Sequence, residues 1–236
     1  MNAPKMKKWL PMYLFAALIC ISLAFLCSDS VTVAVQNSPV PRSRRVIVDA
    51  GHGGIDGGAT SCTGVLESGI NLQIALRLND LLNLLGYDTV MIRTTDTSVY
   101  TEGSTIAAQK VSDLKERVRI CNETENGILV SIHQNTFSDG RYSGPQVFYA
   151  TTGESRTLAE GLQNRLNEVL NPESHRAAKT TDTVYLLRNI RCEGVLIECG
   201  FLSNPAEEAL LRDGAYQQKL CAVIASALGD FFQRNS

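Results

Sequence analysis

Short apolar runs alternate along the chain with longer segments in which leucines recur at helical spacing. The run Arg45–Asp49 predicts a buried strand, and Asn71–Leu85 predicts a helix that stops at Gly86. The same pattern predicts further strands at 89–93, 127–133, 146–150, 183–187 and 195–199, and further helices at 112–121, 154–170 and 216–232. Because strands and helices alternate, the fold class is predicted to be α/β, with one domain and a largely parallel, twisted sheet flanked by helices on both faces.

Two local signals refine this pattern. Asn204 is expected to cap a short helix that Pro205 opens, with Glu207, three residues later, as its capping partner. The polar segment 94–111 is long for a connection and is expected to be a functional loop.

The N-terminal segment 1–28 has a different pattern. Three lysines precede the apolar run Trp9–Cys27, whose length fits either a cleaved signal peptide or an uncleaved signal anchor. Residues 29–44 are polar, contain two prolines and are expected to be a linker to a folded domain at 45–236. With the basic end held in the cytoplasm, that domain is expected outside the cytoplasmic membrane, either membrane-anchored or secreted.

Composition narrows the function classes. The 236 residues are 44% hydrophobic and 19% charged, which argues against a disordered, collagen-like or multi-pass membrane protein. The net charge of −2 and the lack of a long basic run argue against nucleic acid as a partner. The seven cysteines contain no CxxC pair, so neither a disulfide scaffold nor a thiolate zinc finger is expected.

Candidate chemistry gathers at the ends of the predicted strands. His52 and His133 follow apolar strands, and ligands bind at that edge of open α/β sheets. Glu67 precedes the first long helix, and Glu198 ends the apolar run that begins at Gly194. Two imidazoles and a carboxylate form a catalytic zinc set, and a further glutamate would serve as base. Each residue also has a structural reading: satisfied polar histidines, or, for Glu67, a glutamate favoured by the helix dipole.

The order of the motifs is similar to that of a known enzyme family. The motifs are Val48–Gly54 with Asp56, Gly57 and Gly58; Glu67; Val90–Thr94 with Asp96; Leu114–Asn122 containing Arg117; Ser131–Asn135; and Ile197–Asn204. Together they resemble, over residues 45–234, the zinc-dependent N-acetylmuramoyl-L-alanine amidases known as amidase type 3. Gln134 and Cys199 depart from the family pattern, but neither departure removes a candidate ligand.

This resemblance implies one zinc ion held by His52, Glu67 and His133, with Glu198 as general base. It also implies that residues 45–236 cleave the amide between N-acetylmuramic acid and L-alanine of the stem peptide in peptidoglycan. Three further roles stay open. Asn135 binds substrate, orients a ligand or caps a loop; Asp56 partners a histidine or forms a turn; Arg93, like Arg117, binds peptide carboxylates or makes a structural ion pair.

A subgroup of the family is also indicated. The segments Thr101–Gly103, Asp113–Arg117, Val184–Asn189 and Gly200–Pro205 look like the sporulation amidases of endospore formers. Those enzymes strip stem peptides from spore cortex before muramic-δ-lactam forms, and the lactam is recognised at germination. The resemblance implies the cell wall or the spore cortex space as the location, and some members look as if they need an accessory lipoprotein. A vegetative cell-wall amidase is the alternative.

Other classes of protein are kept as rivals. A thiol hydrolase would use Cys199, a catalytically silent module would bind the wall without cleaving it, and a zinc carboxypeptidase would release single amino acids. Sensitivity to a chelator or to an alkylating agent separates the first of these from the zinc enzyme.

Overall fold

The structure is a computed structural model, and it describes residues 44–234. Within this part of the chain, six strands form one mixed sheet. The strand order is β2-β1-β3-β6-β4-β5, and every neighbouring pair is parallel except β4 and β6. The elements are β1 (Arg45–Ala50), α2 (Glu67–Leu84), β2 (Asp88–Met91), α3 (Ile106–Glu123), β3 (Gly127–Asn135), β4 (Gln146–Tyr149), α4 (Ser155–Leu170), β5 (Lys179–Thr180), α5 (Tyr185–Asn189), β6 (Glu193–Phe201), α6 (Pro205–Arg212) and α7 (Gly214–Arg234).

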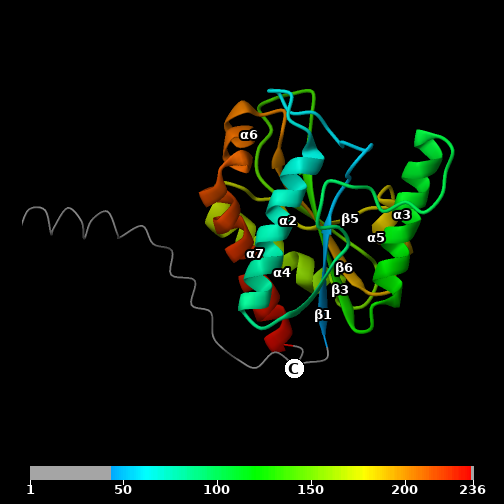
Figure 1. Cartoon of the computed structure of the whole chain (residues 1–236). Helices are drawn as coiled ribbons and strands as arrows, with labels where there is room; N and C mark the ends of the chain where they lie inside the picture. Colours follow the sequence, from blue (N-terminus) through cyan, green and yellow to red (C-terminus); the bar gives the residue numbers. More distant parts are fainter. Residues whose placement is uncertain (1–43, 235–236) are drawn as a thin grey trace, which may run out of the picture. The chain divides into compact units, whose positions relative to one another are not determined.

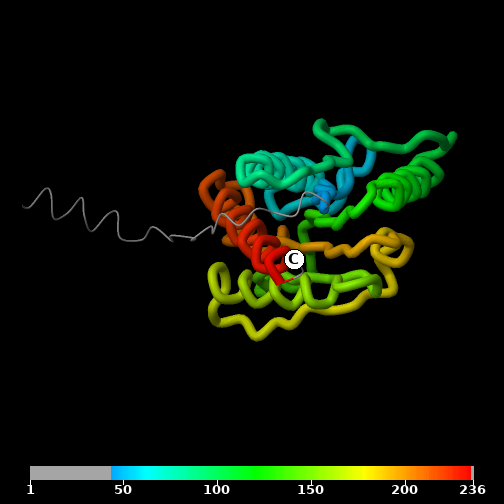
Figure 2. Tube along the Cα trace, turned by 90° about the horizontal axis from the view of Figure 1, so that it is seen from below, coloured from blue at the N-terminus to red at the C-terminus, as the bar shows by residue number. Residues whose placement is uncertain are grey.

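Helices cover both faces of this sheet, as the alternation of elements predicts. Helices α2, α4 and α7 lie on one side, and α3 and α5 lie on the other (Figure 1). Figure 2 shows the same separation from below, with the C-terminal helix beside α2 and α4. The predicted α/β fold with a largely parallel sheet is therefore confirmed.

The central strands send alternate side chains into two separate apolar clusters. Val46 and Val48 of β1 pack with α2, α4 and α7, whereas Ile47 packs with residues of α3 and α5. In β3, Val130 faces the larger cluster and Leu129 the smaller one. By the same alternation, His133 lies on the face that α3 and α5 cover, at the carboxyl end of β3.

The predicted strand at 183–187 is wrong. Tyr185–Asn189 forms the short helix α5, whose Leu186 and Leu187 are buried in the smaller cluster. A short apolar run can be buried as strand or as helix, so its composition does not decide between them. The edge strand β5 is instead the polar pair Lys179–Thr180, which no hydrophobic pattern marks.

The capping role predicted for Glu207 is also wrong. Asn204 does cap α6, since its side chain accepts from Ala206 N (3.0 Å) and Glu207 N (3.2 Å). The Glu207 carboxylate does not return to Asn204, however, and instead accepts from Gly144 N (2.6 Å) and Phe201 N (2.8 Å). It thereby ties the loop before β4 to the end of β6 at the carboxyl edge of the sheet.

The long connection after β2 is shorter than expected. Helix α3 already begins at Ile106, and the Thr105 side chain caps it by accepting from Ala108 N at 3.2 Å. Part of the segment 94–111 is thus helix, and Lys110 lies inside it.

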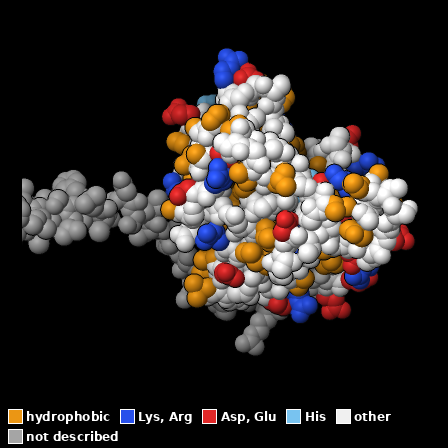
Figure 3. Space-filling model, turned by 45° about the horizontal axis from the view of Figure 1, so that its top comes forward, with side chains coloured by type: hydrophobic (Ala, Val, Ile, Leu, Met, Phe, Trp, Pro, Cys, Tyr) orange, Lys and Arg blue, Asp and Glu red, His pale blue; other side chains and the backbone are white. Residues whose placement is uncertain are grey.

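The leader and linker expected at 1–28 and 29–44 lie outside the described residues, apart from Arg44. Among the described helices, none has the length and apolar character needed to span a bilayer. Basic and acidic side chains of the described domain are interspersed over the face seen in Figure 3.

Candidate metal centre

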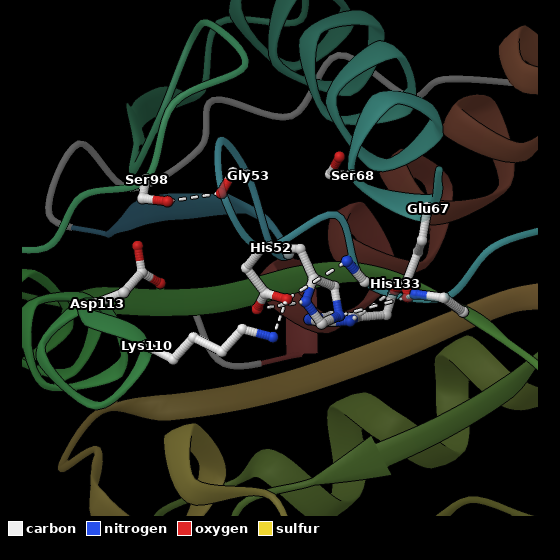
Figure 4. A network of polar contacts seen from close by, with 12 residues as sticks. His52, Gly53, Glu67, Ser68, Ser98, Lys110, Asp113 and His133 are labelled. Carbon is white, nitrogen blue, oxygen red and sulfur yellow. Dashed lines mark hydrogen bonds and ion pairs between the residues drawn. The ribbon is translucent and has the colours of Figure 1, made fainter. Parts of the chain in front are cut away.

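Three predicted ligands meet at the carboxyl edge of the sheet (Figure 4). One ligand atom from each of His52, Glu67 and His133 lies within 4.8 Å of the others. His52 Nε2 is 3.3 Å from Glu67 Oε2, and His133 Nδ1 is 3.0 Å from Glu67 Oε1. The imidazole rings are 5.0 Å apart and stand edge to face at 73°. This group could hold a metal ion.

The turn after β1 brings His52 to this position by an unusual backbone conformation. His52 has φ of 61°, a left-handed value that is uncommon for residues other than glycine. Its neighbours must be small: a Cβ at Gly51 would lie 2.2 Å from His133 Nε2, and one at Gly58 would lie 2.6 Å from Glu67 Oε2. The glycines of this turn therefore let the backbone approach both candidate ligands closely.

Glu67 is buried at the start of α2 and is surrounded by donors. Its Oε2 accepts from Ala59 N at 2.9 Å, and its Oε1 accepts from Asn71 Nδ2 and Gln134 N, both at 3.1 Å. These bonds fix the orientation of a carboxylate that would be costly to bury alone. Asn71 was not among the predicted site residues, although a polar residue amid the buried face of α2 is a signal that could have found it.

The outer nitrogen of His52 has a carboxylate partner. Nδ1 lies 2.9 Å from Asp56 Oδ2, and Asp56 Oδ1 is 2.7 Å from Lys110 Nζ of α3. Asp56 thus sits as the partner of a histidine, one of the two roles that the sequence left open. Lys110 carried no signal in the sequence.

Charges at the centre shift the pKa values of His52 and Glu67. Burial lowers the pKa of His52, but hydrogen bonds and charges from Glu67 and Asp56 outweigh it and raise the pKa to about 9. Burial raises the pKa of Glu67, but the two histidines outweigh it and hold that pKa well below its usual range. Glu67 is therefore a carboxylate, and positive charge is favoured between these side chains.

Glu198 stands next to this group on the neighbouring strand. It is paired in register with His133, β3 to β6, so both side chains emerge on the same face of the sheet. Its Oε2 is buried and has no hydrogen-bond partner among the described residues. Burial raises the pKa of Glu198 to about 6, and the nearby Glu67 adds to this while the two histidines oppose it. The sequence placed Glu198 at the end of its strand. Strand β6 in fact continues to Phe201, so Glu198 lies within it.

The two arginines of the predicted motifs have structural partners. Arg93 is 3% exposed and donates to the backbone carbonyls of Ala50 (2.8 Å), Gly51 (3.1 Å) and Ser68 (2.8 Å), so its guanidinium is occupied within the fold. Arg117 pairs with buried Asp49 and, at 2.6 Å, with Asp113. Arg117 thus makes the structural ion pair that was one of its two readings, whereas Arg93 is held by backbone carbonyls and makes no ion pair among the described residues.

Two further candidates are placed by local contacts. The Asn135 side chain accepts from Thr136 N at 2.8 Å, which is a loop-capping contact. Cys199 is fully buried, and burial raises the pKa of its thiol well above the usual value. A thiol that is neither exposed nor ionised is a poor nucleophile, which counts against the thiol hydrolase.

The chain matches a known protein family over most of its length. The family model that matches residues 46–230 is described as N-acetylmuramoyl-L-alanine amidase. The germination-specific N-acetylmuramoyl-L-alanine amidase of Bacillus subtilis (strain 168) is 36% identical over 196 residues, which are 82% of this chain and 82% of that protein. The amidase LytC of the same organism is 29% identical over 80% of this chain and 35% of its own length.

Solved structures of amidases are also similar to this chain. The CwlD amidase from Clostridioides difficile, solved in complex with the GerS lipoprotein, has a TM-score of 0.77 and 36% identity, covering 82% of this chain and all of that one. An N-acetylmuramoyl-L-alanine amidase from Clostridium difficile 630 has a TM-score of 0.71 and 28% identity over 83% of this chain and all of its own.

Proposed function

The chain belongs to the N-acetylmuramoyl-L-alanine amidase family and is a peptidoglycan amidase, and we propose that it works with one zinc ion held by His52, Glu67 and His133. The observation that carries the proposal is the grouping of these three side chains within 4.8 Å beside the buried, unpartnered Oε2 of Glu198.

The donor set fits zinc. Two imidazoles and one carboxylate are a common zinc set in hydrolases, and the favoured positive charge between them supports a cation there. When bound, zinc would polarise the scissile carbonyl and make a water molecule more acidic.

Glu198 is the proposed general base. With its pKa raised to about 6 by burial, the side chain is ionised at neutral pH yet accepts a proton readily. It would take a proton from the attacking water and deliver it to the nitrogen of L-alanine as the bond to the lactyl group breaks. Asp56, on Nδ1 of His52, would hold that ring in orientation.

The relatives support a proposal for the biological setting. We propose that the protein acts outside the cytoplasmic membrane on spore cortex peptidoglycan, because a germination-specific amidase is 36% identical to it. An accessory lipoprotein is the proposed partner, since a similar amidase has been solved with one. A vegetative cell-wall role is the alternative, supported by the similarity to LytC.

Mass spectrometry of the products tests the activity. The purified protein is incubated with zinc and peptidoglycan from cortex or from vegetative walls, with the Glu198→Gln variant as control. Intact stem peptides with a free L-alanine amine, released by the wild type alone and faster from cortex, are expected. Single released amino acids would indicate a carboxypeptidase, and faster release from vegetative wall would contradict the cortex role.

A further inference from the structure

One face of α3 is turned toward the turn that carries His52. Lys110, Asp113 and Arg117 are spaced three and four residues apart, so they form one stripe along the helix. Figure 4 shows Lys110 projecting from α3 toward the histidines, with Asp113 further along the same helix. Apart from Arg117, only Ser112 and Cys121 of this helix are buried. Polar contacts therefore make up much of the attachment of α3 to the site.

The far end of the stripe holds the main chain of His52. Arg117 Nη2 donates to the carbonyl oxygen of His52 at 2.7 Å, and Nη1 donates to that of Ala50 at 3.0 Å. Asp113 in turn fixes Arg117 through a 2.6 Å contact to Nε. The left-handed backbone of His52 is thus anchored from α3.

The near end of the stripe holds the side chain of His52 through Asp56. Lys110 Nζ is 2.7 Å from Asp56 Oδ1, whose other contact is a long one, 3.4 Å, from Gly58 N. The second oxygen, Oδ2, is the one that meets His52 Nδ1 at 2.9 Å. Apart from the His52 ring itself, Lys110 is therefore the closest partner that restrains rotation of this carboxylate, which is 26% exposed.

We propose that Lys110 is a positioning residue of the metal centre, which keeps Asp56 on Nδ1 of His52 so that Nε2 stays directed at the metal. This inference rests on the proposed zinc site. With Nδ1–H donating to Asp56, the nitrogen left for a metal is Nε2, which lies 3.3 Å from Glu67 Oε2. Without Lys110, the carboxylate can turn away and the ring loses its outer support.

The charge of Lys110 and its proposed positioning role predict opposite effects of its removal on zinc affinity, so the sign of the change distinguishes them. Lys110 is a cation near a cation site, so removing it as a mere charge would tighten zinc binding. Removing it as a positioning residue would weaken zinc binding. Loss of a direct outer partner of a ligand costs about 10- to 100-fold in metal affinity, and Lys110 is one contact further out, so about 3- to 10-fold is expected.

The experiment measures zinc affinity by competition with a chromophoric chelator. Lys110→Met is compared with Lys115→Met, which removes an exposed lysine on the same helix that makes no hydrogen bond or ion pair within the described domain. Weaker binding by Lys110→Met, near-normal binding by Lys110→Arg and unchanged binding by Lys115→Met are expected. The ¹⁵N resonance of the His52 Nδ1–H should broaden in Lys110→Met alone.

A double-mutant cycle with Asp56→Ala completes the test. In that background Lys110→Met should have no further effect, because the proposed action runs through Asp56. Equal affinities of Lys110→Met and Lys115→Met, tighter binding by Lys110→Met, or full additivity with Asp56→Ala would overturn the inference. A wild-type protein that binds no zinc would overturn the proposed function itself, and this inference with it.

Discussion

Replacing Glu198 by glutamine should stabilise the metal-free protein while it removes activity. Burial raises the pKa of this carboxyl from its ordinary 4.5 to about 6. A tenfold change in proton affinity is worth about 1.4 kcal/mol, so the ionised form of Glu198 costs the fold about 2 kcal/mol above pH 6. Glutamine has the shape of the protonated carboxyl and carries no charge, so it avoids this cost.

The stability gain from Glu198→Gln should depend on pH. A carboxyl whose pKa is raised on folding costs nothing below its unfolded pKa of 4.5, and the full cost is present once the pH exceeds about 6. The gain from Glu198→Gln should therefore be near zero at pH 4 and about 2 kcal/mol at pH 8. Urea unfolding in the presence of a chelator measures it, with Glu125→Gln, at an exposed glutamate, as a control that stays flat.

The same variant tests catalysis. Loss of a general base lowers turnover by about 10²- to 10⁴-fold, and this should hold with zinc affinity retained. A variant that binds zinc and keeps near-normal turnover would refute the assignment of Glu198 as base. A stability gain that does not change with pH would refute the argument from burial.

Three further outcomes are expected. A chelator should abolish amidase activity, and zinc should restore it, whereas a thiol alkylating agent should leave folded protein active because Cys199 is fully buried. Arg117→Met should lower the free energy of unfolding by about 3–5 kcal/mol in urea titrations, since it leaves the buried carboxylate of Asp49 without its cation. The rate kcat/KM should fall on the acid side with a midpoint at or below about 6, because Glu198 must be ionised and a bound cation favours that form.

The sequence predicted the parts of the site that follow from strand ends. His52 and His133 could be placed because each follows an apolar run, and parallel strands bring their carboxyl ends to one edge. Glu198 could be paired with them because an acidic residue within a buried strand needs a reason to be there. These are signals of local pattern that the topology carries directly into space.

Other parts of the site depend on contacts that no local pattern encodes. Lys110 reaches Asp56 across more than fifty residues of chain, and its neighbours on α3 look like any solvated helix face. Glu207 had the right spacing for a capping box, but its carboxylate instead accepts hydrogen bonds from Gly144 N and from Phe201 N at the end of β6. Helix α5 was mistaken for a strand because five residues are too few to show a period.

The strand order makes the pairing of one strand depend on a strand that comes later in the chain. Strand β4 bonds only to β5 and β6, and β6 lies between β3 and β4, so β4 has no place on the sheet until the later β6 has been inserted. Since β6 also carries Glu198, the last strand to reach the middle of the sheet completes the site. A polypeptide cut short before β6 would therefore lose the sheet edge formed by β4 and β5 together with Glu198, so no chain that ends before β6 can hold the complete site.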